Sequence, residues 1–192
     1  MHSNPGTMRL FLAVFPTDAV CTAAVGVADA LRTRGNQVAW VRRENLHYTL
    51  RFLGDVGEDD VAAAADAARE AAEKHAAFDA QLDAPGAFPN ATKARVLWLG
   101  MREGAEPLCA LARSLEDALA TRGFTRADPP FAPHLTIGRV RMPADWSTRL
   151  AAAPAPAARF RVERLVLVRS TLGPGGSRYT RLHEAPLARI QR

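Results

Sequence analysis

The sequence predicts an α+β fold in which two pseudo-symmetric lobes, built largely from antiparallel sheets, enclose a central cleft. The first observation is that each half of the 192-residue chain shows the order strand, helix, strand, helix, strand. The second is a short pattern, His-x-Thr followed by Leu or Ile, which occurs at His47 and again at His134. The third is its position: each histidine follows the start of its half, Met8 or Arg95, by 39 residues. A duplicated unit accounts for all three.

The duplication predicts a single domain over residues 8–192, with lobes at roughly 8–90 and 91–192. Residues 1–7 are short of apolar side chains, and we expect a flexible tail there. Met8 is then as good a candidate for the natural start as Met1.

In the first half, apolar runs predict strands, and helical spacing between capping residues and glycines predicts helices. Pro16 closes the first strand, Gly35 stops the first helix, and the carboxylates at 58–60 suit the positive end of the second helix. The expected elements are a strand over 9–15, a helix from 17 or 18 to about Arg34, an extended segment over 38–41, the His47 strand over 45–53, a helix over 58–77, and a strand over 78–83 before a Pro85-Gly86 turn.

The second half repeats this order of elements. Gly123 stops its first helix, and Pro154-Ala-Pro156 interrupts the chain after its second. The expected elements are a strand over 95–99, a helix over 107–120, the His134 strand over 133–140, a short helix over 144–153, a strand over 160–169, a hairpin turn at Gly173-Pro-Gly-Gly176 and a last strand over 178–183.

The composition, with 48% hydrophobic residues, is that of an ordinary globular protein. No stretch approaches the ~20 apolar residues of a membrane span and no cleavable leader is recognisable, so we expect no membrane partner and a cytoplasmic location. Cys21 and Cys109 form neither a metal-binding nor a disulfide pattern, which fits a reducing compartment. The net charge of +5 favours anionic partners such as phosphate esters or RNA, although a genomic bias toward arginine explains it equally well.

The paired motif is the strongest signal for function. With 5 His, 12 Thr and 22 Leu or Ile residues, chance placement gives about 0.04 matches, and the chain has two. Alternate side chains of a strand share a face, so His47 should point with Thr49, and His134 with Thr136. Two imidazoles that titrate near pH 6.5 are suited to acid-base chemistry, and the hydroxyls and a nearby arginine can donate hydrogen bonds to phosphoryl oxygens. The motifs therefore favour hydrolysis or transesterification of a phosphodiester.

Other interpretations of these residues are weaker. A single His-x-Thr is usually a hydrogen-bonded part of a scaffold, but repetition at matched positions argues against that for the pair. Neither motif has a carboxylate or a cysteine two or four residues later to complete a ligand set, so we expect no metal and no cofactor. The glycine-rich segment 173–177 lacks the lysine of a nucleotide-binding loop, and Ser170 lacks the setting of a nucleophile. Motif context is also missing around His2, His75 and His183.

With their flanking residues, the motifs resemble the LigT-like branch of the two-histidine phosphoesterase superfamily. The first follows Trp-Val-x-x-Glu-Asn-Leu over 40–46 and precedes Phe-Leu-Gly at 52–54, and the second is Pro-His-Leu-Thr-Ile-Gly-Arg over 133–139. The resemblance extends from about residue 8 to about residue 185. It implies an RNA 2′,3′-cyclic phosphodiesterase, of the kind formerly described as 2′-5′ RNA ligases, and we expect the enzyme to be a monomer. Such an enzyme hydrolyses RNA ends that carry a 2′,3′-cyclic phosphate to a 2′-phosphate, without ATP or metal.

The resemblance also implies roles for five residues. His47 would donate a proton to the departing ribose O3′, and His134 would accept a proton from the attacking water. Thr49 and Thr136 would hold the phosphate, and Arg139 would add a cationic contact. Strict strand alternation would turn that arginine away from the cleft, so the role requires a β-bulge, which the glycine before it would allow.

Several activities remain open on the sequence alone. The enzyme alternatives are cyclic phosphodiesterase activity on small nucleotides and reversible 2′-5′ RNA ligation. The alternative outside enzymes is an RNA-binding module without catalysis, but both motifs are intact and no RNP-type aromatic signature is present. Phe52, Phe131 and Tyr179 are candidates to stack on the terminal base, and each is as readily a core residue.

Overall fold

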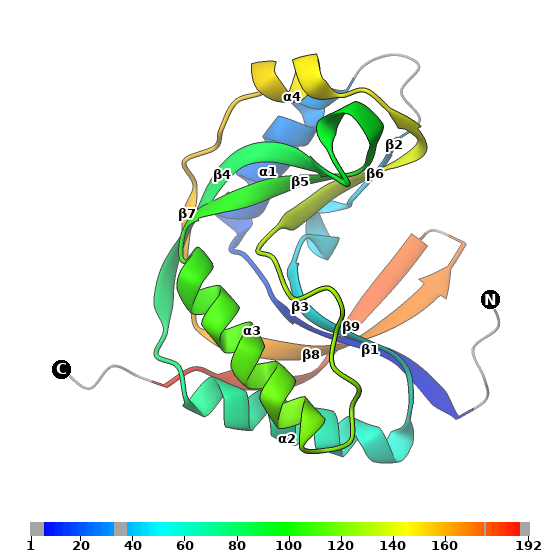
Figure 1. Cartoon of the computed structure of the whole chain (residues 1–192), viewed down its shortest axis with the longest axis vertical. Coiled ribbons are helices and arrows are strands. Elements are labelled where there is room, and N and C mark those ends of the chain that lie inside the picture. The colour runs from blue at the N-terminus through cyan, green and yellow to red at the C-terminus, as the bar shows by residue number, and fades with distance from the viewer. Residues whose placement is uncertain (1–5, 33–37, 175, 189–192) are drawn as a thin grey trace.

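Two antiparallel sheets form the body of the protein. The computed structural model describes residues 6–32, 38–174 and 176–188. The strands are β1 (Thr7–Val14), β2 (Val38–Trp40), β3 (Tyr48–Gly57), β4 (Phe78–Phe88), β5 (Ala94–Glu103), β6 (Leu135–Ala144), β7 (Arg159–Val162), β8 (Arg164–Gly173) and β9 (Gly176–Pro186). Four of them form one sheet in the order β3-β1-β8-β9, in the lower part of Figure 1, and five form the upper sheet in the order β2-β6-β5-β4-β7. The predicted α+β class with antiparallel sheets is confirmed.

The two sheets do not coincide with the sequence halves that we expected to form the lobes. The strands β1 and β3 of the first half lie in one sheet with β8 and β9 of the second, joined by the pairing of β1 with β8, and β5 and β6 of the second half lie in one sheet with β2 and β4 of the first. Each half therefore contributes its third long strand to the sheet that holds the first two long strands of the other half. There β4 lies between β5 and β7, and β8 lies between β1 and β9. A boundary near residue 90 does not separate the sheets, because backbone pairing between halves satisfies strand edges that each half would leave open.

Two of the helices also connect the two halves of the chain. They are α1 (Asp18–Leu31), α2 (Glu58–Glu73), α3 (Ala105–Ala120) and α4 (Ser147–Ala152), with two short 3-10 helices, η1 (Arg43–Asn45) and η2 (Ala91–Lys93). The first helix of each half contacts the motif strand of the other, α1 against β6 and α3 against β3. In the described ranges, no helix is long and apolar enough to cross a membrane.

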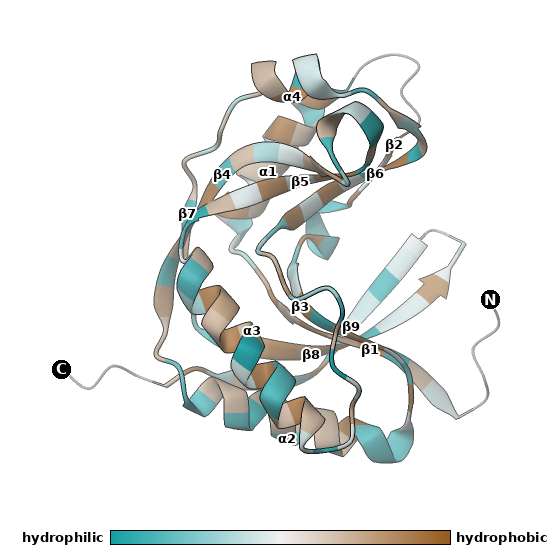
Figure 2. Cartoon of the chain, viewed as in Figure 1, coloured by the Kyte–Doolittle hydropathy of each residue, from teal (hydrophilic) through white to brown (hydrophobic). Residues whose placement is uncertain are grey.

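The strands β1 and β8 lie in the middle of their sheet, and this position explains the run of apolar residues in each. In β1, Leu10, Leu12 and Val14 face the main core, whereas Phe11 and Ala13 face a second, smaller cluster with two valines of β8. In Figure 2, β8 is brown where it passes behind α3 and pale beyond it, until its arrowhead at the hairpin with β9, which is brown again. Because both faces of these strands are covered, the period-2 pattern of a half-exposed strand is absent there.

The Pro85-Gly86 pair is not a turn, contrary to expectation. The strand β4 continues through it, and Pro85 and Gly86 pair with Leu99 and Trp98 of β5. A Cβ atom on Gly86 would lie 2.4 Å from the Trp98 ring. Glycine is therefore present to let the indole lie flat across the strand, which is one of the roles of glycine inside a sheet.

The expected strand over 160–169 is two strands in different sheets. Residues before Glu163 form β7 and pair with β4, and residues after it form β8 and pair with β1 and β9. The hairpin expected at Gly173-Pro-Gly-Gly176 is confirmed by the pairing of Gly173 with Gly176. Residues 1–5 of the expected tail lie outside the described residues, and Thr7 already belongs to β1. The first helix, expected to continue to about residue 34, ends at Leu31, because the backbone of Arg32 is extended.

Glycine at position 104 is predicted to be required for stability, unlike glycine at position 26. Gly104 precedes α3 with φ of +84°, and a Cβ atom there would lie 2.7 Å from the Asp79 carbonyl oxygen. Gly26 lies in α1 with nothing within 4 Å of an added Cβ. We expect Gly104→Ala to lower the free energy of unfolding by about 1–3 kcal/mol and Gly26→Ala to raise it by about 0.5–1 kcal/mol, measured by urea denaturation. Equal effects of the two substitutions would contradict this account.

Candidate active site

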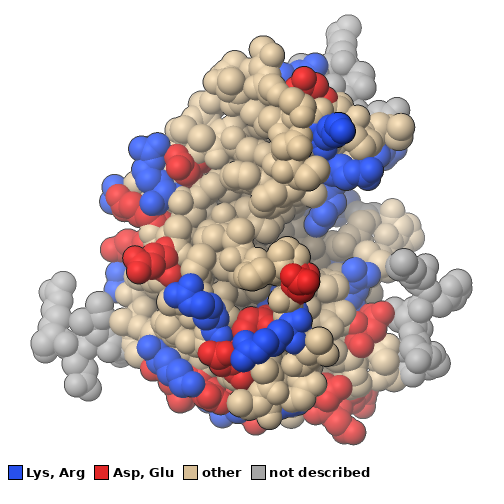
Figure 3. Space-filling view, in the orientation of Figure 1, with Lys and Arg blue, Asp and Glu red and all other residues tan. Residues whose placement is uncertain are grey.

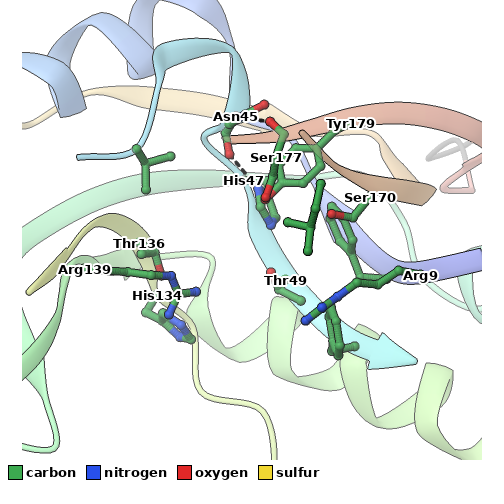
Figure 4. Close-up of a pocket in the computed structure, with 14 residues that line it drawn as sticks. Arg9, Asn45, His47, Thr49, His134, Thr136, Arg139, Ser170, Ser177 and Tyr179 are labelled. Carbon is green, nitrogen blue, oxygen red and sulfur yellow. Dashed lines mark hydrogen bonds between the residues drawn. The ribbon is translucent and has the colours of Figure 1, made fainter. Parts of the chain in front are cut away.

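A pocket of about 390 Å³ lies between the motif strands β3 and β6. Figure 4 shows His47 and Thr49 on one wall and His134, Thr136 and Arg139 on the other. All five residues predicted from the sequence therefore line one cavity. The remaining lining residues are Arg9, Phe11, Val41, Asn45, Phe52, Ser170, Leu172, Ser177 and Tyr179.

Both histidines lie one residue before the strands that were expected to contain them. The strand β3 begins at Tyr48 and β6 at Leu135. His47 Nδ1 lies 2.7 Å from the Asn45 carbonyl oxygen, and His134 Nδ1 lies 2.8 Å from the Ala132 carbonyl oxygen. In each motif, the ring is thus held by the main chain two residues earlier.

These two hydrogen bonds determine which nitrogen of each ring is free for chemistry. A carbonyl oxygen can only accept, so Nδ1 of each imidazole carries the proton and donates it. The nitrogen that can gain or lose a proton is therefore Nε2 in both rings. A pair of equivalent nitrogens on opposite walls of one pocket can hold one proton and accept another.

A β-bulge follows the threonine in each motif strand. Between β1 and β3 the register passes from Leu12 opposite Arg51 to Ala13 opposite Thr49, which leaves Leu50 as an extra residue. Between β5 and β6 it passes from Gly138 to Thr136, which leaves Ile137 as the extra residue. The bulge expected near Gly138 is therefore present one residue earlier.

The bulges place the fifth residue after each histidine in the pocket. That residue is Phe52 in the first strand and Arg139 in the second, and both line the cavity. The two walls are thus alike in backbone and different in chemistry. An aromatic ring that is 45% exposed faces one side, and an exposed guanidinium faces the other.

The surroundings of the two histidines also differ. The His47 ring packs against Phe11 at 4.8 Å, Tyr179 at 5.2 Å and Phe15 at 5.7 Å between centroids. The His134 ring contacts Phe88, edge to face at 5.1 Å. His47 therefore lies on the small apolar cluster beneath the cleft.

This apolar setting lowers the pKa of His47 below its ordinary value. Burial is the main cause, because it disfavours the charged imidazolium, and repulsion from the positive charge of Arg139 and from the His134 ring when that ring is protonated lowers the pKa further. The hydrogen bond to the Asn45 carbonyl opposes these effects. In the free protein, His47 is consequently a neutral imidazole at pH 7.

Asn45 connects the first motif to the β8-β9 hairpin. Its carbonyl oxygen holds the His47 ring, and its side-chain Nδ2 donates to the Ser177 carbonyl oxygen at 2.9 Å. Figure 4 shows these two bonds as dashed lines. The hairpin that carries Tyr179 is thereby held beside the catalytic wall.

Sequence reasoning did not identify several pocket residues. Arg9 follows no motif, and its guanidinium lies 4.9 Å from the Phe52 ring centroid. Asn45 was present only within the Glu-Asn-Leu lead-in. Of the three aromatic candidates, Phe52 and Tyr179 line this pocket, whereas Phe131 lines a neighbouring groove.

The pocket residues offer proton transfer, hydrogen bonding and cationic contacts. In the part of the chain that the structure describes, no three His, Cys, Asp or Glu side chains are grouped as metal ligands would be. Figure 3 shows arginine or lysine atoms along the upper rim of the hollow between the sheets. Such a site is suited to an anionic ligand.

Comparisons with known proteins agree with this chemistry. A family model described as the 2′-5′ RNA ligase superfamily matches residues 16–174. A protein of Methanothermobacter thermautotrophicus named RNA 2′,3′-cyclic phosphodiesterase is 35% identical over 178 residues, which cover 90% of this chain and 95% of the relative. One of the same name from Thermotoga maritima is 33% identical over 178 residues, covering 92% and 94%.

Solved structures show the same architecture. A Thermus thermophilus protein superposes with a TM-score of 0.83 at 31% identity, covering 96% of this chain and 100% of that one. The E. coli LigT protein complexed with 3′-AMP superposes with a TM-score of 0.78 at 28% identity, covering 95% and 99%.

We expect the binding of an anion in the pocket to raise the pKa of His47. An anion offsets the repulsion from Arg139 and stabilises the imidazolium, so binding takes up a proton and the affinity increases as the pH falls. Sulfate is a suitable probe because it stays a dianion between pH 5 and 8. NMR titration of the ring resonances should give a pKa below about 6.5 for His47 in the free protein and a higher one with sulfate.

His75 provides the control in the same titration. Burial also lowers its pKa, but its Nε2 contacts Ser114 Oγ at 2.8 Å and it does not line the pocket. Sulfate should leave its titration unchanged. Equal responses of His47 and His75 would show that sulfate acts by general screening and not in the pocket.

Proposed function

The chain belongs to the 2′-5′ RNA ligase superfamily, and from this we propose that it hydrolyses RNA 2′,3′-cyclic phosphate termini to 2′-phosphomonoesters. One observation carries the proposal. The main chain holds Nδ1 of both motif histidines, which leaves two Nε2 atoms on opposite walls of one pocket. The names of the relatives support the same substrate class.

The reaction needs one proton acceptor and one proton donor. His134 Nε2 accepts a proton from water while the water oxygen attacks phosphorus. The bond from phosphorus to O3′ then breaks, and the Nε2 proton of His47 is transferred to O3′. The product carries a 2′-phosphate and a free 3′-hydroxyl. Proton exchange with solvent restores both rings, so no other reactant is consumed.

The other three predicted residues bind the phosphoryl group in this proposal. The hydroxyls of Thr49 and Thr136 donate hydrogen bonds to its non-bridging oxygens, and Arg139 balances the charge that grows on them. Burial lowers the pKa of His47, so its role as the acid depends on the substrate. The negative phosphodiester stabilises the imidazolium in the bound complex, and the proton is then held where the leaving oxygen needs it.

Phe52 is suited to hold the terminal base. It occupies in β3 the place that Arg139 occupies in β6, and 45% of its surface is exposed. The Arg9 guanidinium lies against its ring, so the base would stack on a ring that is already supported. Aromatic stacking is tolerant of base identity, which suits an enzyme acting on many RNA ends.

The proposal also includes the organisation expected from the sequence. We infer a single domain over residues 8–192, acting as a cytoplasmic monomer without metal or other cofactor. Support comes from the family match across 16–174 and from the two cysteines, which are free thiols. The side chains that line the pocket can supply the proton transfers and the phosphate contacts of the proposed reaction.

The direct test is to identify the product. Protein treated with EDTA should convert an RNA ending in a 2′,3′-cyclic phosphate to a 2′-phosphate, observed by phosphorus NMR. Persistence of the cyclic ester would refute the proposed activity. A 3′-phosphate product would reverse the assigned leaving oxygen, and inhibition by EDTA would contradict metal independence. Adding an RNA with a free 5′-hydroxyl tests 2′-5′ ligation, in which that hydroxyl attacks phosphorus in place of water, O3′ leaves and a 2′-5′ linkage forms.

Substitution of either histidine should remove most of the activity. We expect His47→Ala and His134→Ala each to lower kcat by about 10²–10⁴, because each removes one proton transfer from the same transition state. The double variant should lose less than the product of the two effects. His75→Ala, which removes a histidine outside the pocket, is the matched control and should retain full activity.

The pH profile should distinguish the two roles. For the parent protein, kcat/KM should be bell-shaped in pH, because the base must be neutral and the acid protonated. Residual activity of His47→Ala should lose the fall at high pH, and that of His134→Ala should lose the fall at low pH. The opposite pattern would exchange the roles of acid and base.

A further inference from the structure

A second pocket, of about 450 Å³, adjoins the active-site pocket. Asn45, Ser177 and Tyr179 line both pockets, and the hydrogen bond from Asn45 Nδ2 to the Ser177 carbonyl oxygen belongs to this shared wall. The second pocket extends from the wall toward Arg42, before η1, and toward the β8-β9 hairpin. A ligand that extends past Tyr179 from the first pocket would enter the second.

Two arginines line the second pocket without a carboxylate partner. Their neighbours in the sequence or on the same strand are paired, since Arg43 contacts Asp18 and Arg181 contacts Glu184. Within the described ranges, Arg42 and Arg178 form no ion pair, and their guanidinium groups keep their hydrogen-bond donors available. An unpaired guanidinium is suited to bind phosphate oxygens in a bidentate manner.

The acidic residue in this lining is Glu44. Over the described part of the chain its carboxylate has no ion-pair partner. A carboxylate can only accept hydrogen bonds. The ribose 2′-hydroxyl is the group of an RNA backbone that can donate one, and it is absent from DNA.

The groove on the other side of the active site has a different character. It is lined mostly by apolar residues, among them Phe52, Phe88 and Phe131, and it reaches Thr49 and His134. Its arginine, Arg51, is already paired with Glu116 at 3.0 Å, and both side chains are largely buried. The pocket with Arg42 and Arg178 is therefore better suited to bind a charged sugar-phosphate backbone.

We propose that the second pocket is a subsite for the nucleotide upstream of the terminal one. In it, Arg42 and Arg178 bind the phosphodiester that joins the two nucleotides, and Glu44 accepts a hydrogen bond from the upstream 2′-hydroxyl. The inference rests on the proposed function and narrows its substrate to oligoribonucleotides, in preference to cyclic mononucleotides. It also accounts for the hydrogen bond that holds the hairpin beside the active site.

The test compares three substrates that share the same terminal cyclic phosphate. They are the mononucleotide, the dinucleotide, and a dinucleotide whose linking phosphate is a neutral methylphosphonate. We expect kcat/KM of the dinucleotide to exceed that of the mononucleotide by about tenfold to hundredfold, as charge-assisted hydrogen bonds to phosphate allow. The methylphosphonate should lose most of this advantage, and this comparison requires no variant.

Substitutions in the second pocket test which residues cause the preference for the dinucleotide. In the double variant Arg42→Gln/Arg178→Gln, the dinucleotide to mononucleotide ratio should fall toward one, and the charged and neutral dinucleotides should become equivalent. Glu44→Ala, which removes the hydrogen-bond acceptor, should remove the preference for an upstream ribose over a deoxyribose. Arg113→Gln, which removes an exposed arginine of α3 that lines neither of these pockets, is the matched control and should keep the ratio.

The outcomes separate this inference from the proposed function. If no cyclic substrate is hydrolysed, the proposed function fails. If mononucleotide and dinucleotide are hydrolysed with equal kcat/KM, the proposed function stands and the subsite is refuted. A ratio that survives in the double variant would likewise refute the assignment to Arg42 and Arg178.

Discussion

The hydrogen bond from each histidine Nδ1 to the carbonyl oxygen two residues earlier is the interaction on which the site depends. An imidazole has two nitrogens of similar basicity, and either could face a substrate. The carbonyl oxygens of Asn45 and Ala132 remove that freedom, because they can only accept. The main chain thus fixes the tautomer and orientation of both rings without a dedicated side chain. Proton transfer is limited to the two Nε2 atoms on the walls of the pocket.

The bulges after the threonines extend this arrangement along each strand. Without them, the residue five positions after each histidine would point away from the pocket. With them, the pocket gains Phe52 from β3 and Arg139 from β6. The duplicated backbone thus forms a site for an asymmetric ligand. Phe52 can contact an apolar part of that ligand, and Arg139 can contact an anionic part. The apolar setting of His47 is a second departure from symmetry, and burial there lowers the pKa of that ring.

The exchange of strands between the halves keeps the two walls in place relative to each other. Because β4 and β8 each lie in a sheet with the first long strands of the opposite half, the two sequence halves share backbone hydrogen bonds within each sheet and do not merely contact one another. The Arg51 to Glu116 ion pair adds a link between β3 and α3, the helix of the other half. The elements that form the cleft are consequently joined by the chain itself and by backbone hydrogen bonds. The geometry of the cleft does not depend on the closure of a separate domain.

The sequence by itself determined the fold class, the paired motif and the five residues around the pocket. Those predictions depend on local quantities, namely side-chain alternation, glycine and proline positions and a repeated pattern. Only the tertiary structure decided that Pro85-Gly86 continues a strand, that the run after Phe160 divides between two sheets, and that Asn45 connects a histidine to a hairpin. Each of these depends on a partner far away in the sequence: the Trp98 ring over Gly86, the neighbouring strands on either side of Glu163, and the Ser177 carbonyl. A local sequence pattern does not identify such partners, because the same residues could pack against a different neighbour in another fold.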